Sequence, residues 1–323
     1  MRWLSDESVP LRQRLAQSGA LHFVNFTLPS ERTGLRTFCD ALSAFVPCED
    51  PLTSVGVRKL LSAADGVYEA VNSEALSKTF IGLHNDATYK LTAPYAAFAC
   101  IRPASSGGDF LVVDGRQLLA DLPAHVLEPL CAKNVSVRVA ALELRFLLSL
   151  PATLRQPLAR AIELLVGLAL RLAVPLELQL AWGRIEADDG GGDDGGGCGG
   201  SACVLQILET AKPPVNRHPV SGEPTFFSSL HSQSRYLQRR RAALFSESAL
   251  SRVASTDAFY GVAALTPMEP ALLDDLDTVM SRLVHRVPMR RGDVVLLDSY
   301  QVLHGRDVFD GPREHAVVWL ADR

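Results

Sequence analysis

The sequence predicts a mainly β protein of the α+β class, in which a core of short strands is decorated with helices. Two strand-rich regions near the chain ends support this: residues 93–101 with 110–114, and residues 294–297 with 316–320. Segments with helical spacing of apolar residues lie between them. This order favours helices added around a β-core over regular alternation of strand and helix.

Length and composition are those of an ordinary globular protein. The 323 residues are 47% hydrophobic and 21% charged, enough for one large β domain with insertions. The formal net charge of −4 provides no bulk attraction to nucleic acid or to an anionic membrane. We therefore expect a small-molecule partner and neither nucleic acid nor membrane. The sequence gives no signal for an oligomeric state.

Several features predict a cytoplasmic location. The first residues lack the basic-then-apolar order of a signal peptide. Charged residues interrupt the apolar region 142–182, so it holds no uncharged span of about 18 residues that could cross a membrane. The six cysteines are scattered, and Cys198 with Cys203 alone is a weak metal signal, so reduced thiols are expected.

The N-terminal third begins with a helix in residues 1–20, followed by a strand at 20–26 and a helix at 30–45. His22 lies inside that strand, where a satisfied core or edge histidine is a better interpretation than a metal ligand. Residues 50–79 are polar and irregular. After them comes the segment that contains His84 and Asp86.

The middle of the chain begins with the buried strand 93–101, a Gly-Gly turn at 105–109 and strand 110–114, predicted as a hairpin. Residues 117–130 and 141–182 are predicted to be helical, and the glycine- and aspartate-rich run 188–200 is predicted to be a disordered loop. Because strand-like sequence resumes at 202–208, we expect one domain over 1–323 with an insertion at about 140–202.

The last third has a turn at 216–224, a charged helix at 235–244 and an amphipathic helix at 272–287. The arginines at 239–241 could touch phosphate, although a solvated helix face is the simpler reading. Strand 294–297 then leads to His304, and a Gly-Pro corner leads to Arg313 and strand 316–320. This order would place His304 and Arg313 at one mouth of a β-sheet.

The chemistry depends on bringing His84, Asp86 and His304 together. A His-x-Asp triplet alone is weak, since 36 acidic residues among 323 give eight histidines about one such match by chance. Two histidines and one carboxylate are, however, the facial triad of non-haem Fe(II) oxygenases, which leaves positions for a 2-oxo acid and O2. Arg313 could bind the far carboxylate of that acid in bidentate geometry.

A purely structural interpretation stays open for each residue taken singly. His304 could be a core histidine that ends a strand, and Asp86 could cap a turn. Four neighbours of the proposed centre are candidates for substrate binding, with structural packing as the alternative: Asn85, Tyr89, Tyr300 and Arg306.

Several short motifs in the same order resemble the taurine/2-oxoglutarate dioxygenase (TauD/TfdA-like) family from about Leu21 to the C-terminus. They are Leu-His-Asn-Asp at 83–86, the 97–109 segment with Asp114, the 217–223 segment, and the Gly-Asp, Leu-Asp, His-Gly-Arg and Phe-x-Gly-x-Arg series that closes at Arg313. The resemblance implies a double-stranded β-helix, or jelly roll, of the clavaminate synthase-like type.

The resemblance also implies an enzyme, a dioxygenase that uses Fe(II), 2-oxoglutarate and O2 and releases succinate and CO2. His84, Asp86 and His304 would bind the iron, and Arg313 would hold 2-oxoglutarate. Hydroxylation of an unactivated C–H bond is the usual outcome in this family, and a carboxylate at 86 argues against halogenation.

Two positions depart from the family pattern. Phe110 replaces a threonine that often helps to hold 2-oxoglutarate, and Val317 replaces the arginine that reads sulfonate in taurine-type enzymes. The expected substrate is therefore a small polar metabolite, amino-acid-like, and not a sulfonate. The alternatives are a catalytically inactive binding or scaffold protein of the same fold, and a nucleic-acid demethylase, which the net charge opposes.

Overall fold

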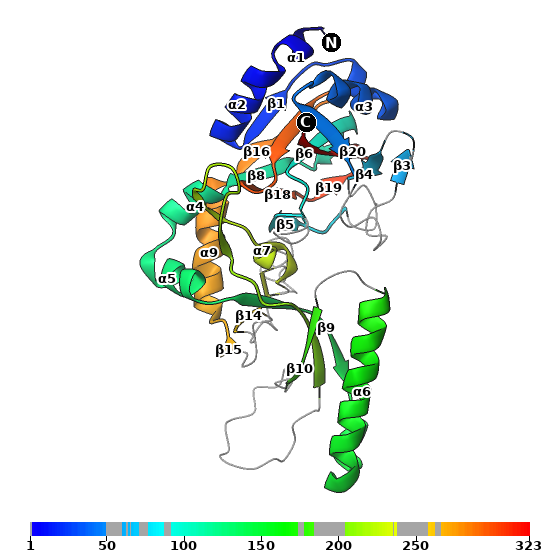
Figure 1. Ribbon diagram of the computed structural model, residues 1–323, viewed down its shortest axis with the longest axis vertical. Helices are drawn as coiled ribbons and strands as arrows, with labels where there is room; N and C mark the ends of the chain where they lie inside the picture. The colour runs from blue at the N-terminus through cyan, green and yellow to red at the C-terminus, as the bar shows by residue number, and fades with distance from the viewer. Residues whose placement is uncertain are drawn as a thin grey trace. The chain divides into compact units, whose positions relative to one another are not determined.

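The computed structural model describes residues 2–49, 60–62, 64, 66–70, 77–86, 92–173, 178–183, 204–234, 236–237, 258–261 and 266–323. Its contacts divide the chain into two compact units (Figure 1). Unit 1 comprises residues 1–128, 214–232 and 275–323, and unit 2 comprises 129–213 and 233–274. Unit 2 includes the whole predicted insertion, and the single-domain reading stays a prediction.

Unit 1 is built on two antiparallel sheets. The larger sheet has the order β1 (Ala20–Phe23), β17 (Val294–Asp298), β6 (Tyr95–Arg102), β20 (Glu314–Asp322), β4 (Val67–Glu69), β3 (Leu60–Ser62), with β2 (Phe45–Cys48) also pairing with β20. The smaller sheet has the order β16 (His285–Val287), β8 (Phe110–Asp114), β18 (Val302–Arg306), β5 (Ile81–His84). The chain is thus mixed α/β and rich in sheet, as predicted.

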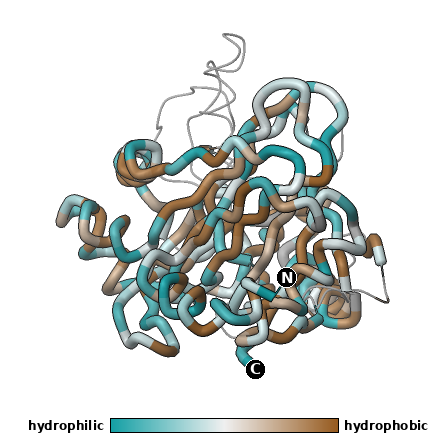
Figure 2. The backbone as a smooth tube through the Cα atoms, turned by 90° about the horizontal axis from the view of Figure 1, so that it is seen from above, coloured by the Kyte–Doolittle hydropathy of each residue, from teal (hydrophilic) through white to brown (hydrophobic). Residues whose placement is uncertain are grey.

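The larger sheet is buried on both faces because its central strands are apolar at successive positions. Val294 and Leu296 of β17 pack in one cluster, together with residues of α2 (Ser8–Ser18) and α3 (Arg32–Ala41). Val295 and Leu297 point to the other cluster, which includes residues of the smaller sheet. The prediction of a strand buried on both faces is confirmed. Figure 2 colours the hydrophobic stretches of the chain brown, and many of them lie in the middle of the view.

The remaining elements of unit 1 are short. They are α1 (Arg2–Asp6), η1 (Leu28–Ser30), β7 (Ser106–Gly107), α4 (Gly115–Asp121), β12 (Val215–Arg217), β13 (Pro224–Phe226), α7 (Leu230–Gln233) and β19 (Phe309–Asp310). Helices α5 (Ala124–Ala132), α7 and α9 (Pro270–Leu283) each include residues of both units.

The predicted hairpin of residues 93–101 and 110–114 is wrong. Strand β6 pairs with β17 and β20, whereas β8 pairs with β16 and β18 in the other sheet. Between them, β7 pairs with β19, and Gly107 and Gly108 have positive φ angles of 65° and 76°. The chain therefore crosses between sheets here. His304 is on β18 of the smaller sheet, whereas Arg313 lies just before β20 of the larger sheet. The two residues therefore do not lie at the mouth of one sheet.

Two predicted helices are shorter than expected. Residues 117–130 form α4 and α5, which are separated at Leu122 and Pro123, because proline favours an extended residue before it. The helix predicted for 272–287 ends at Leu283, and His285–Val287 pairs with β8.

Unit 2 contains a five-stranded antiparallel sheet in the order β10 (Leu178–Gly183), β11 (Val204–Glu209), β9 (Val135–Glu143), β14 (Ala258–Tyr260), β15 (Thr266–Pro267). The wholly helical reading of 141–182 is wrong at both ends, where β9 and β10 lie. Between them are the 3-10 helix η4 (Arg145–Ser149) and helix α6 (Ala152–Ala173). The predicted loop at 188–200 and the arginines at 239–241 lie outside the described residues.

Among the described residues, no helix is long and apolar enough to cross a membrane.

Candidate functional site

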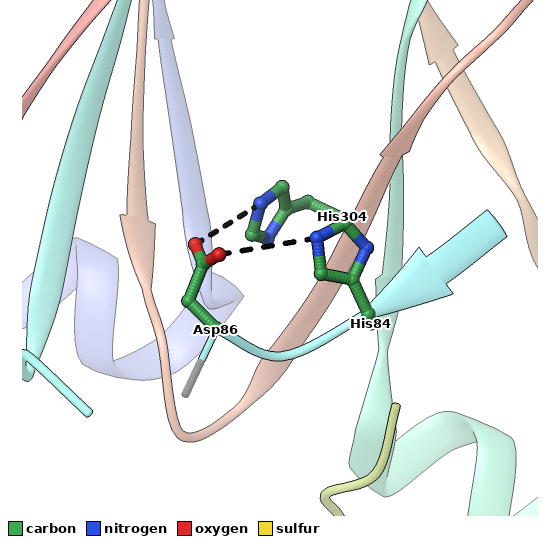
Figure 3. Close-up of side chains that lie close together, drawn as sticks. All are labelled: His84, Asp86 and His304. Atoms are coloured by element: carbon green, nitrogen blue, oxygen red, sulfur yellow. Dashed lines mark ion pairs between the residues drawn. The ribbon is translucent and has the colours of Figure 1, made fainter. Parts of the chain in front are cut away.

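Strand pairing brings the two predicted histidine ligands together. Strand β18 pairs with β5, and His304 lies directly opposite His84 in the register. Their ring centroids are 4.6 Å apart. Asp86 follows β5 by two residues, and its carboxylate turns back toward both rings (Figure 3).

The three side chains offer one compact set of ligand atoms. The Asp86 Oδ2 atom lies 3.3 Å from His304 Nε2, and Asp86 Oδ1 lies 3.9 Å from His84 Nε2. One donor atom from each residue lies within 4.8 Å of the other two. Two imidazole nitrogens and a carboxylate oxygen are the donor set of the facial triad, so these residues fit a non-haem Fe(II) ion.

The orientation of His84 is fixed by its own strand. Its Nδ1–H donates to the carbonyl oxygen of Gly82 at 2.8 Å, so that Nε2 faces Asp86. A metal-binding histidine usually donates its second ring N–H to a carbonyl or carboxylate in this way, which sets the tautomer and the ring direction.

A second histidine, which the sequence analysis missed, supports strand β5 from outside. Nδ1 of His231, on α7, accepts a hydrogen bond from the backbone N–H of Leu83 at 2.9 Å. Because Nδ1 accepts, Nε2 carries the proton and donates to Asp277 at 2.9 Å. A Cβ added at Gly82 would lie 2.5 Å from the carbonyl oxygen of His231, so α7 packs closely on this strand. His231 thereby holds the residue next to His84.

A cavity extends from the histidine pair to a cationic end. His84 and His304 line it together with Phe98 and Phe110, and Arg306, Arg313 and His315 line it as well. All three of these latter side chains are buried. A concave site with apolar walls and a few convergent polar groups is the usual form of a small-molecule pocket.

Burial and mutual repulsion perturb the cationic groups. Burial, and then the charge of Arg306, lower the pKa of Arg313 to about 9. Burial lowers the pKa of Arg306 to about 10, although Asp307 opposes that shift. The pKa of His315 is lowered well below its usual value by burial, Arg313 and Arg306. Each shift has the sign that a bound anion would reverse, so this end of the cavity suits a carboxylate.

Two arginines share one aromatic support there. The guanidinium of Arg306 lies 4.7 Å from the centre of the Phe309 ring, and that of Arg313 lies 5.6 Å from it. Backbone carbonyls accept from both: Thr79 and Asp307 from Arg306, and Ala70 from Arg313. These contacts hold the guanidinium groups in place before any ligand binds.

Phe110, which replaces the family threonine, contacts a ligand histidine. Its ring is stacked on that of His304, with centroids 5.8 Å apart and planes inclined by 10°. Phe98 packs against both rings. At this position the chain therefore has an aromatic wall that limits the movement of His304.

The other predicted site residues are placed differently. The side-chain N–H2 of Asn85 donates to the carbonyls of Ser299 and Val302, and its Oδ1 accepts from the backbone N–H of Ser228. These bonds tie the end of β5 to neighbouring segments, which supports the structural alternative for Asn85. Arg306 does line the cavity, and its role in substrate binding stays a prediction.

Tyr300 is not among the residues that line this cavity; its ring lies edge-on to His218 and tilted to Phe227, each with centroids 6.1 Å away. Tyr89 lies outside the described residues.

The family motif at 217–223 is explained by a buried hydrogen bond between a histidine and an aspartate. His218 Nδ1 accepts from the backbone N–H groups of Val220 and Ser221, so its Nε2–H donates to Asp298 at 3.1 Å. Asp298 in turn accepts from the backbone of Tyr300, in the turn between β17 and β18. This network fixes the approach of β18, which carries His304.

His315 follows Arg313 by two residues, but Arg313 precedes β20 and the register shifts between Glu314 and His315, so strand alternation alone would not have identified His315. His231 carries no sequence signal either, since its role depends on a contact between segments almost 150 residues apart.

Comparison with solved structures found folds similar to this one at low sequence identity. PvcB from Pseudomonas aeruginosa has 14% identity and a TM-score of 0.53, over 99% of this chain and 82% of that chain. Asparagine oxygenase in complex with Fe(II), 3-hydroxyasparagine and succinate has 11% identity and a TM-score of 0.52, over 98% and 78%. These likenesses concern the fold. Comparison with curated protein sequences found no significant match.

The sequence profile of the taurine catabolism dioxygenase TauD, TfdA family matches residues 1–319, nearly the whole chain. The site described above has the donor set and the buried arginine that the sequence resemblance implied. The chain belongs to the TauD, TfdA family and is a dioxygenase that depends on Fe(II) and 2-oxoglutarate.

Proposed function

We propose that His84, Asp86 and His304 bind the Fe(II) ion and that the enzyme hydroxylates an unactivated C–H bond of a small, amino-acid-like metabolite. The observation that carries this proposal is the convergence of the three donor atoms within 4.8 Å. When bound, the ion would supply the site at which 2-oxoglutarate and O2 react. One oxygen atom enters succinate, CO2 leaves, and the other oxygen atom enters the substrate.

The residues of this chain would orient the reactants. Arg313 would bind the far carboxylate of 2-oxoglutarate, and the support for this is its burial at the cationic end of the cavity. A guanidinium pairs with a carboxylate through two parallel hydrogen bonds, which fixes direction as well as affinity. Phe98 and Phe110 would exclude water from the space between the two ends.

The residue at position 317 supports a substrate that is not a sulfonate. Val317 is fully buried in the hydrophobic cluster between the two sheets of unit 1, so no charged side chain acts from that position. One structure to which the chain is similar, that of asparagine oxygenase, holds a hydroxylated amino acid. This agrees with a substrate of the amino-acid class.

Further parts of the proposal follow from the family. We infer that the two sheets of unit 1 form its jelly roll, supported by their antiparallel pairing and the apolar cluster they share. We also propose the cytoplasm as the compartment, supported by free thiols at Cys39, Cys48, Cys100 and Cys131. The inactive scaffold that the sequence left open gains no support from the family match.

Formation of succinate without added substrate tests the proposal. Purified protein supplied with Fe(II), 2-oxoglutarate and O2 should release succinate slowly, and His84→Ala should abolish this release. As a matched control, His125→Ala removes an exposed histidine that pairs with Asp275 and should leave the rate unchanged. Equal succinate formation by wild-type protein and His84→Ala would contradict the proposed iron site.

A further inference from the structure

Helix α6 of unit 2 exposes its most hydrophobic face. Six of its leucines are between 38% and 80% exposed: Leu154, Leu158, Leu164, Leu165, Leu168 and Leu172. None of the helix residues with a described side chain is buried. The family match and the iron site do not account for this surface.

The exposed apolar residues follow a heptad pattern. Positions 154, 158, 161, 165, 168 and 172 are separated by alternating steps of four and three residues, and all six are leucine or alanine. At about 100° per residue, they fall within about 40° of one line along the helix. This line, the leucine seam, is the pattern by which one helix packs along another.

The seam points away from the sheet of unit 2. On the opposite side of α6, Glu163 accepts a hydrogen bond from the indole N–H of Trp182, on β10, at 2.9 Å. A Cβ added at Gly167 would lie 3.6 Å from Leu180 of the same strand. Figure 1 shows α6 running beside the strands of unit 2. The helix thus packs on its own sheet through one face and presents the seam on the other.

We propose that the leucine seam of α6 pairs with the seam of α6 in a second copy of this chain. The two helices are antiparallel, and their two-fold axis crosses the seam at the level of residue 163 along the helix. This arrangement sets Leu154 opposite Leu172, Leu158 opposite Leu168 and Ala161 opposite Leu165 of the second copy. Every layer then contains at least one leucine. Parallel pairing would set Ala161 against Ala161 and leave an underfilled layer at the centre.

The charges beside the seam are compatible with the same arrangement. Antiparallel pairing places Arg155 beside Ala169 and Arg171 beside Pro157 of the second copy, so equal charges do not meet directly. It also opposes the two helix dipoles favourably. A symmetric, self-complementary patch is what a two-fold dimer requires.

The exposed area is appropriate for a reversible dimer. The six leucines together expose nearly four side-chain equivalents, or about 400 Å² of apolar surface at roughly 100 Å² each. The largest apolar patch of a typical monomer is about this size and is often functional. Two copies would cover about 800 Å² through leucines alone, against roughly 1,200–2,000 Å² in total for standard interfaces. We therefore expect a dimer that dissociates at micromolar concentration.

Sedimentation velocity at protein concentrations of about 1 to 100 µM tests this proposal on the full chain. Wild-type protein should shift from monomer to dimer over that range, whereas the variant Leu165→Glu/Leu168→Glu should stay monomeric. The control Arg160→Glu places the same new carboxylate on an exposed position of the same helix but off the seam, and should dimerise as wild type does. Circular dichroism should show equal helix content, because all three replaced side chains are exposed.

Three results would overturn the proposal. The first is wild-type protein that stays monomeric throughout; the second is dimerisation that the seam variant does not weaken. The third is wild-type protein that is monomeric in solution but binds anionic lipid vesicles through the seam, which would identify a membrane as the partner.

Chemical crosslinking tests the orientation. A short bis-maleimide should join two copies of Leu164→Cys beyond the level seen for wild-type protein, which has the exposed Cys131. It should not join two copies of Leu154→Cys, because antiparallel pairing sets those positions at opposite ends. Crosslinking of Leu154→Cys, or of neither variant, would refute antiparallel pairing.

Discussion

Replacement of His231 by leucine tests how the fold positions the first proposed iron ligand. His231 is buried and makes two hydrogen bonds: it accepts from the N–H of Leu83 at 2.9 Å and donates to Asp277 at 2.9 Å. Leucine fills much of the same space but can make neither bond. The replacement therefore deprives a backbone donor of strand β5 and a carboxylate of α9 of their imidazole partner.

The magnitude follows from these two contacts. A buried amide left unsatisfied costs about 1–3 kcal/mol, and loss of a hydrogen bond to a charged group costs about 1.5–3 kcal/mol. We expect His231→Leu to lower the free energy of unfolding by about 3–5 kcal/mol in total. Because Leu83 adjoins His84, we also expect the affinity for Fe(II) to fall by about 10- to 100-fold, as is typical of changes around a ligand.

Urea unfolding and anaerobic calorimetry with Fe(II) measure the two effects. The matched control is His125→Leu, which breaks a His–Asp pair of 2.8 Å whose side chains are 64% and 49% exposed. An exposed pair contributes at most about 1 kcal/mol, and its loss should leave Fe(II) affinity unchanged. If His231→Leu costs no more than His125→Leu, or binds Fe(II) as tightly as wild-type protein, the positioning role is refuted.

Three further predictions concern the carboxylate end of the cavity and the packing of β5. Arg313→Gln should raise the Kd for 2-oxoglutarate by about 100- to 1000-fold, since loss of a buried charged partner costs about 3–4 kcal/mol. The control Arg291→Gln, at an exposed turn, should leave this Kd unchanged. Calorimetry measures both Kd values, and equal values would contradict the assignment. The pKa of Arg313 is lowered to about 9, and a bound dianion favours the charged guanidinium. The affinity for 2-oxoglutarate should therefore be constant below pH 9 and should fall as the pH rises above 9. An affinity that stays constant above pH 9 would contradict this interpretation. Gly82→Ala should destabilise the protein by about 1–3 kcal/mol, because its Cβ would lie 2.5 Å from the His231 carbonyl oxygen. The control Gly167→Ala, in helix α6, should stabilise the protein slightly. Urea unfolding measures both changes, and equal effects would be inconsistent with close packing at Gly82.

Local sequence pattern predicted several strands well, because a continuous apolar run is short-range information. Continuous apolar runs at 294–297 and 316–320 are typical of strands buried on both faces, and the structure has them there. The spacing of His84 and Asp86, with His304 on a late strand, indicated the same three residues that strand pairing brings together.

Strand partners could not be predicted in the same way. The sequence shows that 93–101 and 110–114 are strands, but it carries no information on which neighbour each pairs with, and the two lie in different sheets. The apolar region 141–182 illustrates another limit, since a short apolar run can be strand or helix and only tertiary packing decides. The hydrogen bonds of Asn85 could not be predicted either, because its three backbone partners come from distant segments.

Anaerobic titration of the wild-type protein with Fe(II) and 2-oxoglutarate tests the central claim most directly. If His84, Asp86 and His304 hold the ion and Arg313 steers the oxo acid onto it, a weak visible charge-transfer band should grow to saturation at one equivalent of each. The band should be absent in His84→Ala. A wild-type protein that develops no band at saturating reagents, or a His84→Ala variant that develops the same band, would contradict the account.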